Sequence, residues 1–204
     1  MVTPWDRDED WMKRFAALFL GLTLCGVSVA SKICDSTATE QLEACAKSNY
    51  AEADGKLNSA YKDLLSKTTY QHKNLLVTAQ QNWIKYKEKY CQDAFDATSP
   101  GQEAGIDRWS CLEAVTRARE RELQYFALND DLSDFYHAVD FVARTYEGGD
   151  RDKVIKKINF GYPSKDDGLW LNYVEENCKL ASAMFHEDRL TCVARQNFYR
   201  DWSR

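Results

Sequence analysis

Apolar side chains recur at spacings of three and four residues along most of this chain, which is the pattern of amphipathic helices. Turn residues separate the periodic stretches, among them Thr98-Ser99-Pro100-Gly101, Gly148-Gly149 and Gly161-Tyr162-Pro163. No stretch alternates between apolar and polar residues over the length of a strand. The sequence therefore predicts an all-α fold, with helical patterns over residues 42–64, 75–90, 112–126, 132–146, 154–158, 170–180 and 190–202.

The first thirty residues have the pattern of an N-terminal extension followed by a signal peptide. Lys13-Arg14 precedes an apolar run over residues 15–29, and a small-x-small cleavage site ends at Ala30. The run is too short for a membrane span. Met12 opens this pattern, so we interpret residues 1–11 as an extension in front of the true start.

Cleavage after Ala30 leaves residues 31–204 as the exported chain, which we expect in the periplasm or secreted, with no membrane span. Cys25 lies inside the leader. Leu24 before it is not the small residue that a lipoprotein signal requires, so we do not expect lipid anchoring there.

Six cysteines remain in the exported chain, and in an exported protein they predict three disulfides. The six are Cys34, Cys45, Cys91, Cys111, Cys178 and Cys192. The rival interpretation is a metal site, but the chain has no Cys-x-x-Cys pair and its three histidines are scattered. We therefore expect a disulfide-stapled helical bundle without a metal.

One motif occurs twice. Trp, Tyr, Glu and Cys share a register in residues 83–91 and 170–178, and an Asp-Arg-x-x-Cys step follows each copy at residues 107–111 and 188–192. Each copy thus contains a helix, a cysteine, a loop, a second cysteine and another helix. Two rare residue types in register, twice, indicate an internal duplication.

The duplication predicts two related helical lobes, residues 31–126 and 127–204. In the second lobe, Cys178 and Cys192 have only each other as partners. By analogy Cys91 pairs with Cys111, which leaves the first two cysteines of the first lobe for each other. The residues alone leave a second pairing of the first lobe open, namely Cys34–Cys111 with Cys45–Cys91.

The first lobe carries an ordered set of motifs. They are Cys34-x10-Cys45-Ala46, Leu57-Asn58-x-x-Tyr61, Ala79-Gln80-x-x-Trp83-Ile84-x-Tyr86-x4-Cys91, Cys111-Leu112 and Thr116-x-x-Arg119. This set resembles the N-terminal domain of the LprI-type lysozyme inhibitors, small exported helical modules of bacteria, over residues 34–126. The chain departs from the family at Leu42-Glu43-Ala44, where members often have Met-Asn just before the second cysteine.

The resemblance implies a protein-binding module that inhibits lysozyme. The alternative is an envelope adaptor or structural protein that binds another partner and leaves lysozyme unaffected. We do not expect an enzyme, because the three histidines, His72, His137 and His186, are widely separated in the sequence and none has a companion nucleophile or acid by motif. No cofactor motif is present either.

Charge narrows the partner class. The chain has 27 basic and 32 acidic residues, and removal of the leader leaves 24 against 28. An acidic balance argues against a nucleic-acid partner. It slightly favours a basic protein such as a lysozyme.

The polar loop expected over residues 95–106 is the candidate partner-binding site, with the disulfide Cys91–Cys111 at its base. A loop held at its base loses little entropy on docking, which suits an inhibitory plug. The residues proposed to contact the partner are Asp96, Ser99, Gln102 and Glu103.

Other prominent residues have structural interpretations. The repeated aromatic residues sit on apolar faces and are expected in the core: Trp83, Tyr86, Trp170 and Tyr173. Asp107 and Asp188 are expected to cap helix N-termini. Alternating charges predict a solvated helix face, made of Arg117, Arg119, Glu120, Arg121 and Glu122.

Overall fold

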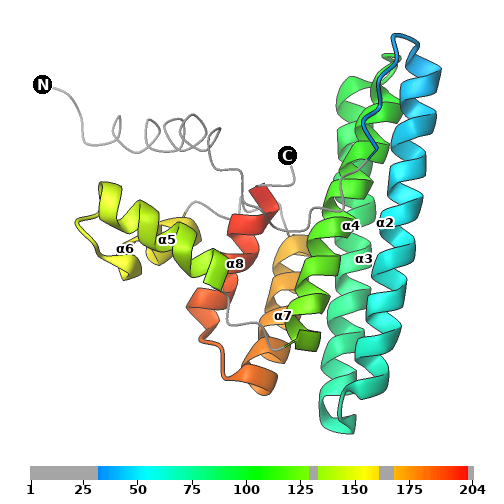
Figure 1. The fold of residues 1–204 in the computed structure, drawn as a ribbon. Helices are drawn as coiled ribbons and strands as arrows, with labels where there is room; N and C mark the ends of the chain where they lie inside the picture. Colours follow the sequence, from blue (N-terminus) through cyan, green and yellow to red (C-terminus); the bar gives the residue numbers. More distant parts are fainter. Residues whose placement is uncertain (1–31, 129–132, 161–167, 202–204) are drawn as a thin grey trace, which may run out of the picture. The chain divides into compact units, whose positions relative to one another are not determined.

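The computed structural model describes residues 32–128, 133–160 and 168–201 (Figure 1). The expected leader, residues 1–30 with Cys25, lies outside the described residues. From Cys34 onward the described chain forms one compact unit. It contains no β-strand in these ranges, so the all-α prediction is confirmed.

The helices follow the periodic stretches of the sequence closely. They are α2 (Thr39–Lys67), α3 (Tyr70–Thr98), α4 (Ala104–Leu128), α5 (Ser133–Tyr146), α6 (Arg151–Phe160), α7 (Gly168–Phe185) and α8 (Arg189–Asp201). No helix among the described residues has the length and apolar character needed to cross a bilayer.

Three long helices make up the first lobe. Helices α2 and α3 each have 29 residues, about 43 Å of helix, and α4 has 25. Helix α4 packs against both α2 and α3 (Figure 1). Its apolar stripe includes Leu112, Val115 and Leu123, which join the buried core. Burial of such side chains contributes about 1.5–3 kcal/mol each, so this stripe stabilises the packing of α4 on the other two helices.

The second lobe packs on the first through α7. Helix α7 lies against α3, and α8 packs on α7 and touches α4 (Figure 1). The α5–α6 hairpin is attached through α6, which packs against α8. Gly148 and Gly149, with φ of 64° and 89°, end α5, and the Gly149 amide donates to the Ala143 carbonyl at 2.8 Å. The predicted stop of this helix is therefore confirmed.

Three disulfides staple the helices. They are Cys34–Cys45, Cys91–Cys111 and Cys178–Cys192, the pairing favoured by analogy between the two copies. Cys91–Cys111 joins α3 to α4, and Cys178–Cys192 joins α7 to α8 in the same way. The disulfide-stapled, two-lobe bundle is confirmed, while the boundary at residues 126 and 127 stays a prediction.

Candidate functional site

The loop between α3 and α4 is shorter than the sequence predicted. Helix α3 continues to Thr98 and α4 begins at Ala104, so only residues 99–103 connect them. The predicted loop bounds, 95 and 106, are wrong. Residues 92–98 contain no helix breaker, whereas Pro100 disfavours a helical conformation at Ser99 and ends the helix there.

The short loop brings the predicted contact residues to one end of the bundle. Asp96, in the last turn of α3, accepts a hydrogen bond from Gln92 at 2.9 Å. Asp96, Ser99, Gln102 and Glu103 are all exposed. The Gly101 amide donates to the Thr98 carbonyl at 2.7 Å, and a Cβ on Gly101 would lie 2.5 Å from that oxygen. The turn therefore requires glycine at this position.

The disulfide Cys91–Cys111 does not close the base of this loop, contrary to expectation. Cys91 is completely buried and lies seven residues before Thr98, which is about two helical turns. The bond joins α3 to α4 in the core instead. The helix ends and the Gly101 turn hold the loop in place.

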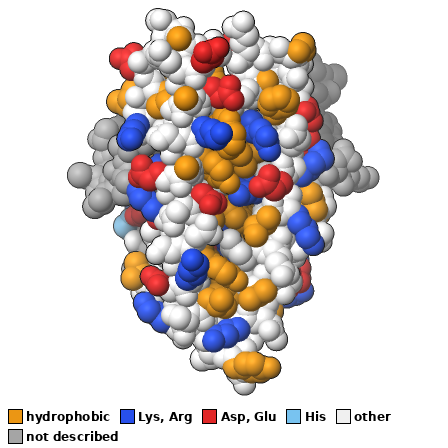
Figure 2. Space-filling model, turned by 90° about the vertical axis from the view of Figure 1, so that its right-hand side faces the viewer, with side chains coloured by type: hydrophobic (Ala, Val, Ile, Leu, Met, Phe, Trp, Pro, Cys, Tyr) orange, Lys and Arg blue, Asp and Glu red, His pale blue; other side chains and the backbone are white. Residues whose placement is uncertain are grey.

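Acidic residues gather at the end of the bundle that carries this loop. Residues 34–46 contain three acids and residues 91–107 contain four, and neither segment has a Lys or Arg. We call these two segments the acidic end. Figure 2 shows acidic side chains at the upper end of the molecule, with the basic side chains of this face below them. The acids are Asp35, Glu40, Glu43, Asp93, Asp96, Glu103 and Asp107.

The two segments of the acidic end touch at Glu43. Its carboxylate packs so closely on Gly105 of α4 that a Cβ on Gly105 would lie 2.4 Å from the carboxyl carbon. The same carboxylate accepts a hydrogen bond from the Trp109 indole at 3.3 Å. Sequence reasoning missed Glu43 and Trp109, although Gly105 between two helix-forming stretches signals a close approach.

Trp109 anchors α4 to α2 below the loop. Its ring centroid lies 5.7 Å from that of Tyr50, and the Lys47 ammonium lies 5.2 Å from the Trp109 ring. Such aromatic and cation–π contacts contribute roughly 0.5–1.5 kcal/mol each. The loop therefore projects from a packed support.

A buried polar network joins the two lobes beneath this support. Arg119 of α4 is 1% exposed and donates to Gln80 at 3.0 Å, to Tyr173 at 3.2 Å and to Asn177 at 2.6 Å. These partners belong to α3 and α7. Burial raises the pKa of Tyr173 to about 12. The prediction that Arg119 lies on a solvated face is wrong.

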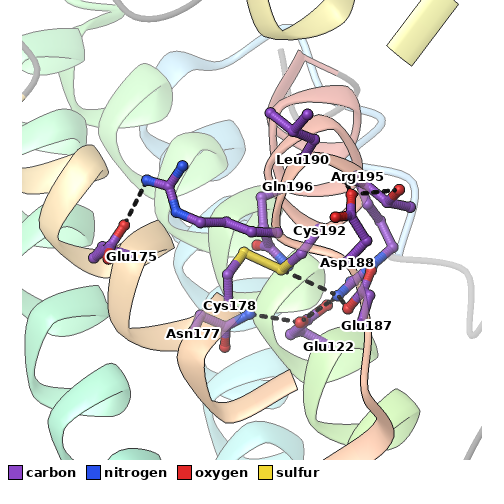
Figure 3. Close-up of a disulfide and its surroundings, with 12 residues drawn as sticks. Glu122, Glu175, Asn177, Cys178, Glu187, Asp188, Leu190, Cys192, Arg195 and Gln196 are labelled. Atoms are coloured by element: carbon purple, nitrogen blue, oxygen red, sulfur yellow. Dashed lines mark hydrogen bonds and ion pairs between the residues drawn. A yellow bond between two sulfur atoms is a disulfide. The ribbon is translucent and has the colours of Figure 1, made fainter. Parts of the chain in front are cut away.

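Glu122 and Arg195 extend this network around the Cys178–Cys192 disulfide (Figure 3). Arg195 of α8 contacts both carboxylate oxygens of Glu122 and also donates to Glu187 at 2.9 Å. The Asn177 amide donates to Glu122 at 2.6 Å. Glu122 is buried as well, so the predicted solvated face is wrong at this residue too.

Electrostatics within the network keep the ion pair charged. Burial alone raises the pKa of Glu122, but the Arg195 charge and the hydrogen bonds from Arg195 and Asn177 outweigh burial and lower it below its ordinary value. Burial alone lowers the pKa of Arg195, yet the Glu122 and Glu187 carboxylates raise it well above its ordinary value. The lobes are thus joined by a desolvated, charged contact.

One protein-family model matches the first lobe. Residues 34–123 match the model of the family described as lysozyme inhibitor LprI. The resemblance expected from the motifs is confirmed over that segment. The match covers slightly less than half of the 204 residues. A search of curated proteins and a search of solved structures found no match.

The LprI segment, residues 34–123, includes α2, α3 and most of α4. All four proposed contact residues lie in it, as do Glu43 and Trp109. Helices α5 to α8 lie outside it, so the LprI match carries no information about them. The repeated aromatic residues of both lobes are buried, as predicted: Trp83, Tyr86, Trp170 and Tyr173.

The two predicted helix caps differ. Asp188 precedes α8, and its carboxylate accepts a hydrogen bond from the Thr191 amide at 3.0 Å, so this N-cap is confirmed. Asp107 lies inside the first turn of α4, which begins three residues earlier, so the N-cap prediction there is wrong. Across the described ranges, no group of three His, Cys, Asp or Glu side chains is arranged to hold a metal ion.

Proposed function

We propose that this protein is an exported lysozyme inhibitor that contacts its target through the acidic end. The observation that carries the proposal is the match of residues 34–123 to the LprI lysozyme inhibitor family. The proposed contact residues Asp96, Ser99, Gln102 and Glu103 are exposed at one end of that segment. They are offered on helix ends and a short turn, so little backbone entropy is lost on docking.

Charge supports the choice of surface. Lysozymes are usually basic, and the acidic end presents seven acids over two segments that have no Lys or Arg. Complementary charge mainly raises the association rate and makes it sensitive to salt. A loop at the acidic end is therefore steered toward a basic partner before any close contact forms.

The disulfides support export. Three disulfides in a chain of this size persist in an oxidising compartment and are rare in the cytosol. We therefore place the protein in the periplasm or outside the cell, where it meets lysozyme. The expected cleavage after Ala30 belongs to the same proposal.

The test is inhibition of lysozymes of several classes by oxidised residues 31–204. We expect inhibition that weakens at least ~10-fold when Asp96 and Glu103 are both replaced by Lys, with a lower association rate at low salt. The matched control is Asp54→Lys combined with Asp63→Lys, because this pair makes the same charge change in the half of α2 away from the acidic end. It should leave inhibition within about 2-fold.

A chain that inhibits no lysozyme class would contradict this proposal. In that case the adaptor interpretation applies, and capture from envelope extracts by the oxidised protein would identify the partner. If both charge variants reduce inhibition equally, the contact is not confined to the acidic end. That result would reject the surface while keeping the function.

A further inference from the structure

The two copies of the repeated motif place an arginine at the same position. Arg119 follows Cys111 of α4 by eight residues, and Arg200 follows Cys192 of α8 by eight residues. Both arginines are buried, although α8 carries no LprI match. In the preceding helices, Trp83, Tyr86, Tyr90 and Cys91 correspond to Trp170, Tyr173, Asn177 and Cys178.

Each arginine stacks on the tyrosine of the other lobe. The Arg119 guanidinium carbon lies 5.2 Å from the centroid of the Tyr173 ring. The Arg200 guanidinium carbon lies 5.4 Å from the centroid of the Tyr86 ring. Tyr86 and Tyr173 are equivalent positions, so the two contacts are reciprocal.

A second pair of equivalent positions, Tyr90 in α3 and Asn177 in α7, is also contacted by the arginine of the other lobe. Arg119 donates to Asn177, and Arg200 lies 5.4 Å from the Tyr90 ring. Asn177 and Tyr90 each stand one residue before the cysteine of their helix. The correspondence is in position, since a hydrogen bond in one copy is replaced by a cation–π contact in the other.

The equivalent tyrosines also contact each other. The rings of Tyr86 and Tyr173 are stacked, with centroids 6.4 Å apart and an angle of 10° between their planes. Contact between equivalent residues, flanked by reciprocal contacts, is the signature of an isologous interface around a two-fold axis. Here the axis relates two lobes of one chain.

We propose that the face of α3 around Tyr86 is a homotypic docking surface, made to receive a second copy of the first lobe. In this chain α7 and α8 occupy it. An isologous patch is complementary to itself. A surface of the first lobe that binds the related second lobe therefore also fits the first lobe of another molecule. When α7 and α8 leave the surface, the first lobe of another molecule takes their place.

The geometry predicts which positions meet in such a pair. The Asn82 side chain donates to the Asn172 carbonyl at 3.4 Å, so positions 82 and 172 are neighbours. Position 172 corresponds to Lys85 in the register of the repeat. In a pair of first lobes, position 82 of one molecule therefore lies beside position 85 of the other.

The experiment uses the exported chain with two substitutions in the second lobe, Tyr173→Glu and Arg200→Glu. They put carboxylates into the buried face of α7 and α8 and leave the first lobe unchanged. In this undocked background, Asn82→Cys chains are mixed with Lys85→Cys chains. Separate chains exclude a disulfide within one helix, and peptide mapping verifies that the three native disulfides persist.

We expect the undocked mixture to form a disulfide-linked 82–85 dimer with a yield at least ~5-fold above that of the same mixture in the native background. The matched control mixes Ser59→Cys and Lys62→Cys chains, which have the same spacing on the exposed surface of α2. The control should give the same low yield in both backgrounds. Light scattering should show a dimer for the undocked chain at lower concentration than for the native one.

A folded undocked chain that stays monomeric would overturn the proposal. A dimer whose 82–85 yield does not exceed the control would also overturn it, since that result indicates exchange of α7 and α8 between molecules. If the double substitution unfolds the first lobe, Arg200→Ala alone replaces it. This milder change should still raise the 82–85 yield above the native background by at least ~2-fold, and an unchanged yield rejects the surface.

Discussion

Arg195 of α8 donates hydrogen bonds to Glu122 of α4 from both terminal nitrogens of its guanidinium group, in the interior between the two lobes. The same guanidinium group donates to Glu187, so one cation serves two buried carboxylates. A buried charge that loses its partner is strongly destabilising, whereas an exposed ion pair contributes little. This contrast makes the network testable.

Replacing Arg195 by Met should lower the free energy of unfolding by about 3–5 kcal/mol, because it removes the cation that pairs with both buried carboxylates, Glu122 and Glu187. Urea denaturation followed by circular dichroism measures the change. Arg189→Met is the control, since Arg189 pairs with Glu175 at 2.8 Å on the surface. This variant should lower the free energy of unfolding by less than about 1 kcal/mol. Equal losses for the two variants would show that the network is not desolvated.

The buried ion pair should also make the free energy of unfolding depend on pH. The folded-state pKa of Glu122 is lowered below its ordinary 4.5, so its contribution is complete above pH 4.5 and declines as the pH falls toward the folded-state pKa. Glu122→Gln should therefore show a shallower loss of stability between about pH 5 and pH 3 than the native chain. Denaturant midpoints across that range measure the slope. Equal slopes for the variant and the native chain would contradict a lowered pKa of Glu122 in the folded state.

Two glycines should respond in opposite directions to alanine. Gly55 lies within α2, and a Cβ there meets nothing within 4 Å, so Gly55→Ala should stabilise the protein by about 0.5–1 kcal/mol. At Gly101 a Cβ would lie 2.5 Å from the Thr98 carbonyl oxygen, so Gly101→Ala should cost about 1–3 kcal/mol or rearrange the turn. Thermal unfolding of both variants measures the difference.

Periodicity was sufficient to predict the helices, because apolar stripes and turn residues report directly on burial. The wrong loop bounds arose where the stripe ends before the helix does. After Cys91 the side chains no longer face the core, yet α3 continues to Thr98 since nothing before Pro100 opposes it. The hydrophobic pattern shows where a helix stops packing against the core, whereas helix breakers such as Pro100 show where the helical backbone ends.

The buried network was missed for a different reason. Charge alone predicts a solvated face at Arg119 and Glu122. Their positions continue the stripe of Leu112, Val115 and Thr116 at spacings of three and four, so the register already assigned them to the core. Their partners Tyr173, Asn177 and Arg195 come from 54 to 73 residues later in the chain, and no local pattern identifies them.

The disulfide Cys91–Cys111 should contribute to stability more than to the geometry of the acidic end. Its two cysteines are 20 residues apart, so removing the bond should cost about 3 kcal/mol in the chain-entropy account. We expect the variant with both cysteines replaced by Ser to unfold at lower denaturant and, while folded, to inhibit lysozyme within about 3-fold of the native chain. The reason is that the bond lies about two helical turns from the loop, which the Gly101 turn and the ends of α3 and α4 hold.

The matching substitution of Cys178 and Cys192 by Ser separates stability from function. It removes a bond of similar span, 14 residues, from the lobe that lacks the LprI match. It should reduce stability by a similar amount and leave inhibition unchanged. A loss of inhibition above ~10-fold in the Cys91 and Cys111 variant alone, measured well below its unfolding midpoint, would show that the bond shapes the acidic end after all. Equal losses in both variants would instead tie inhibition to the stability of the whole bundle.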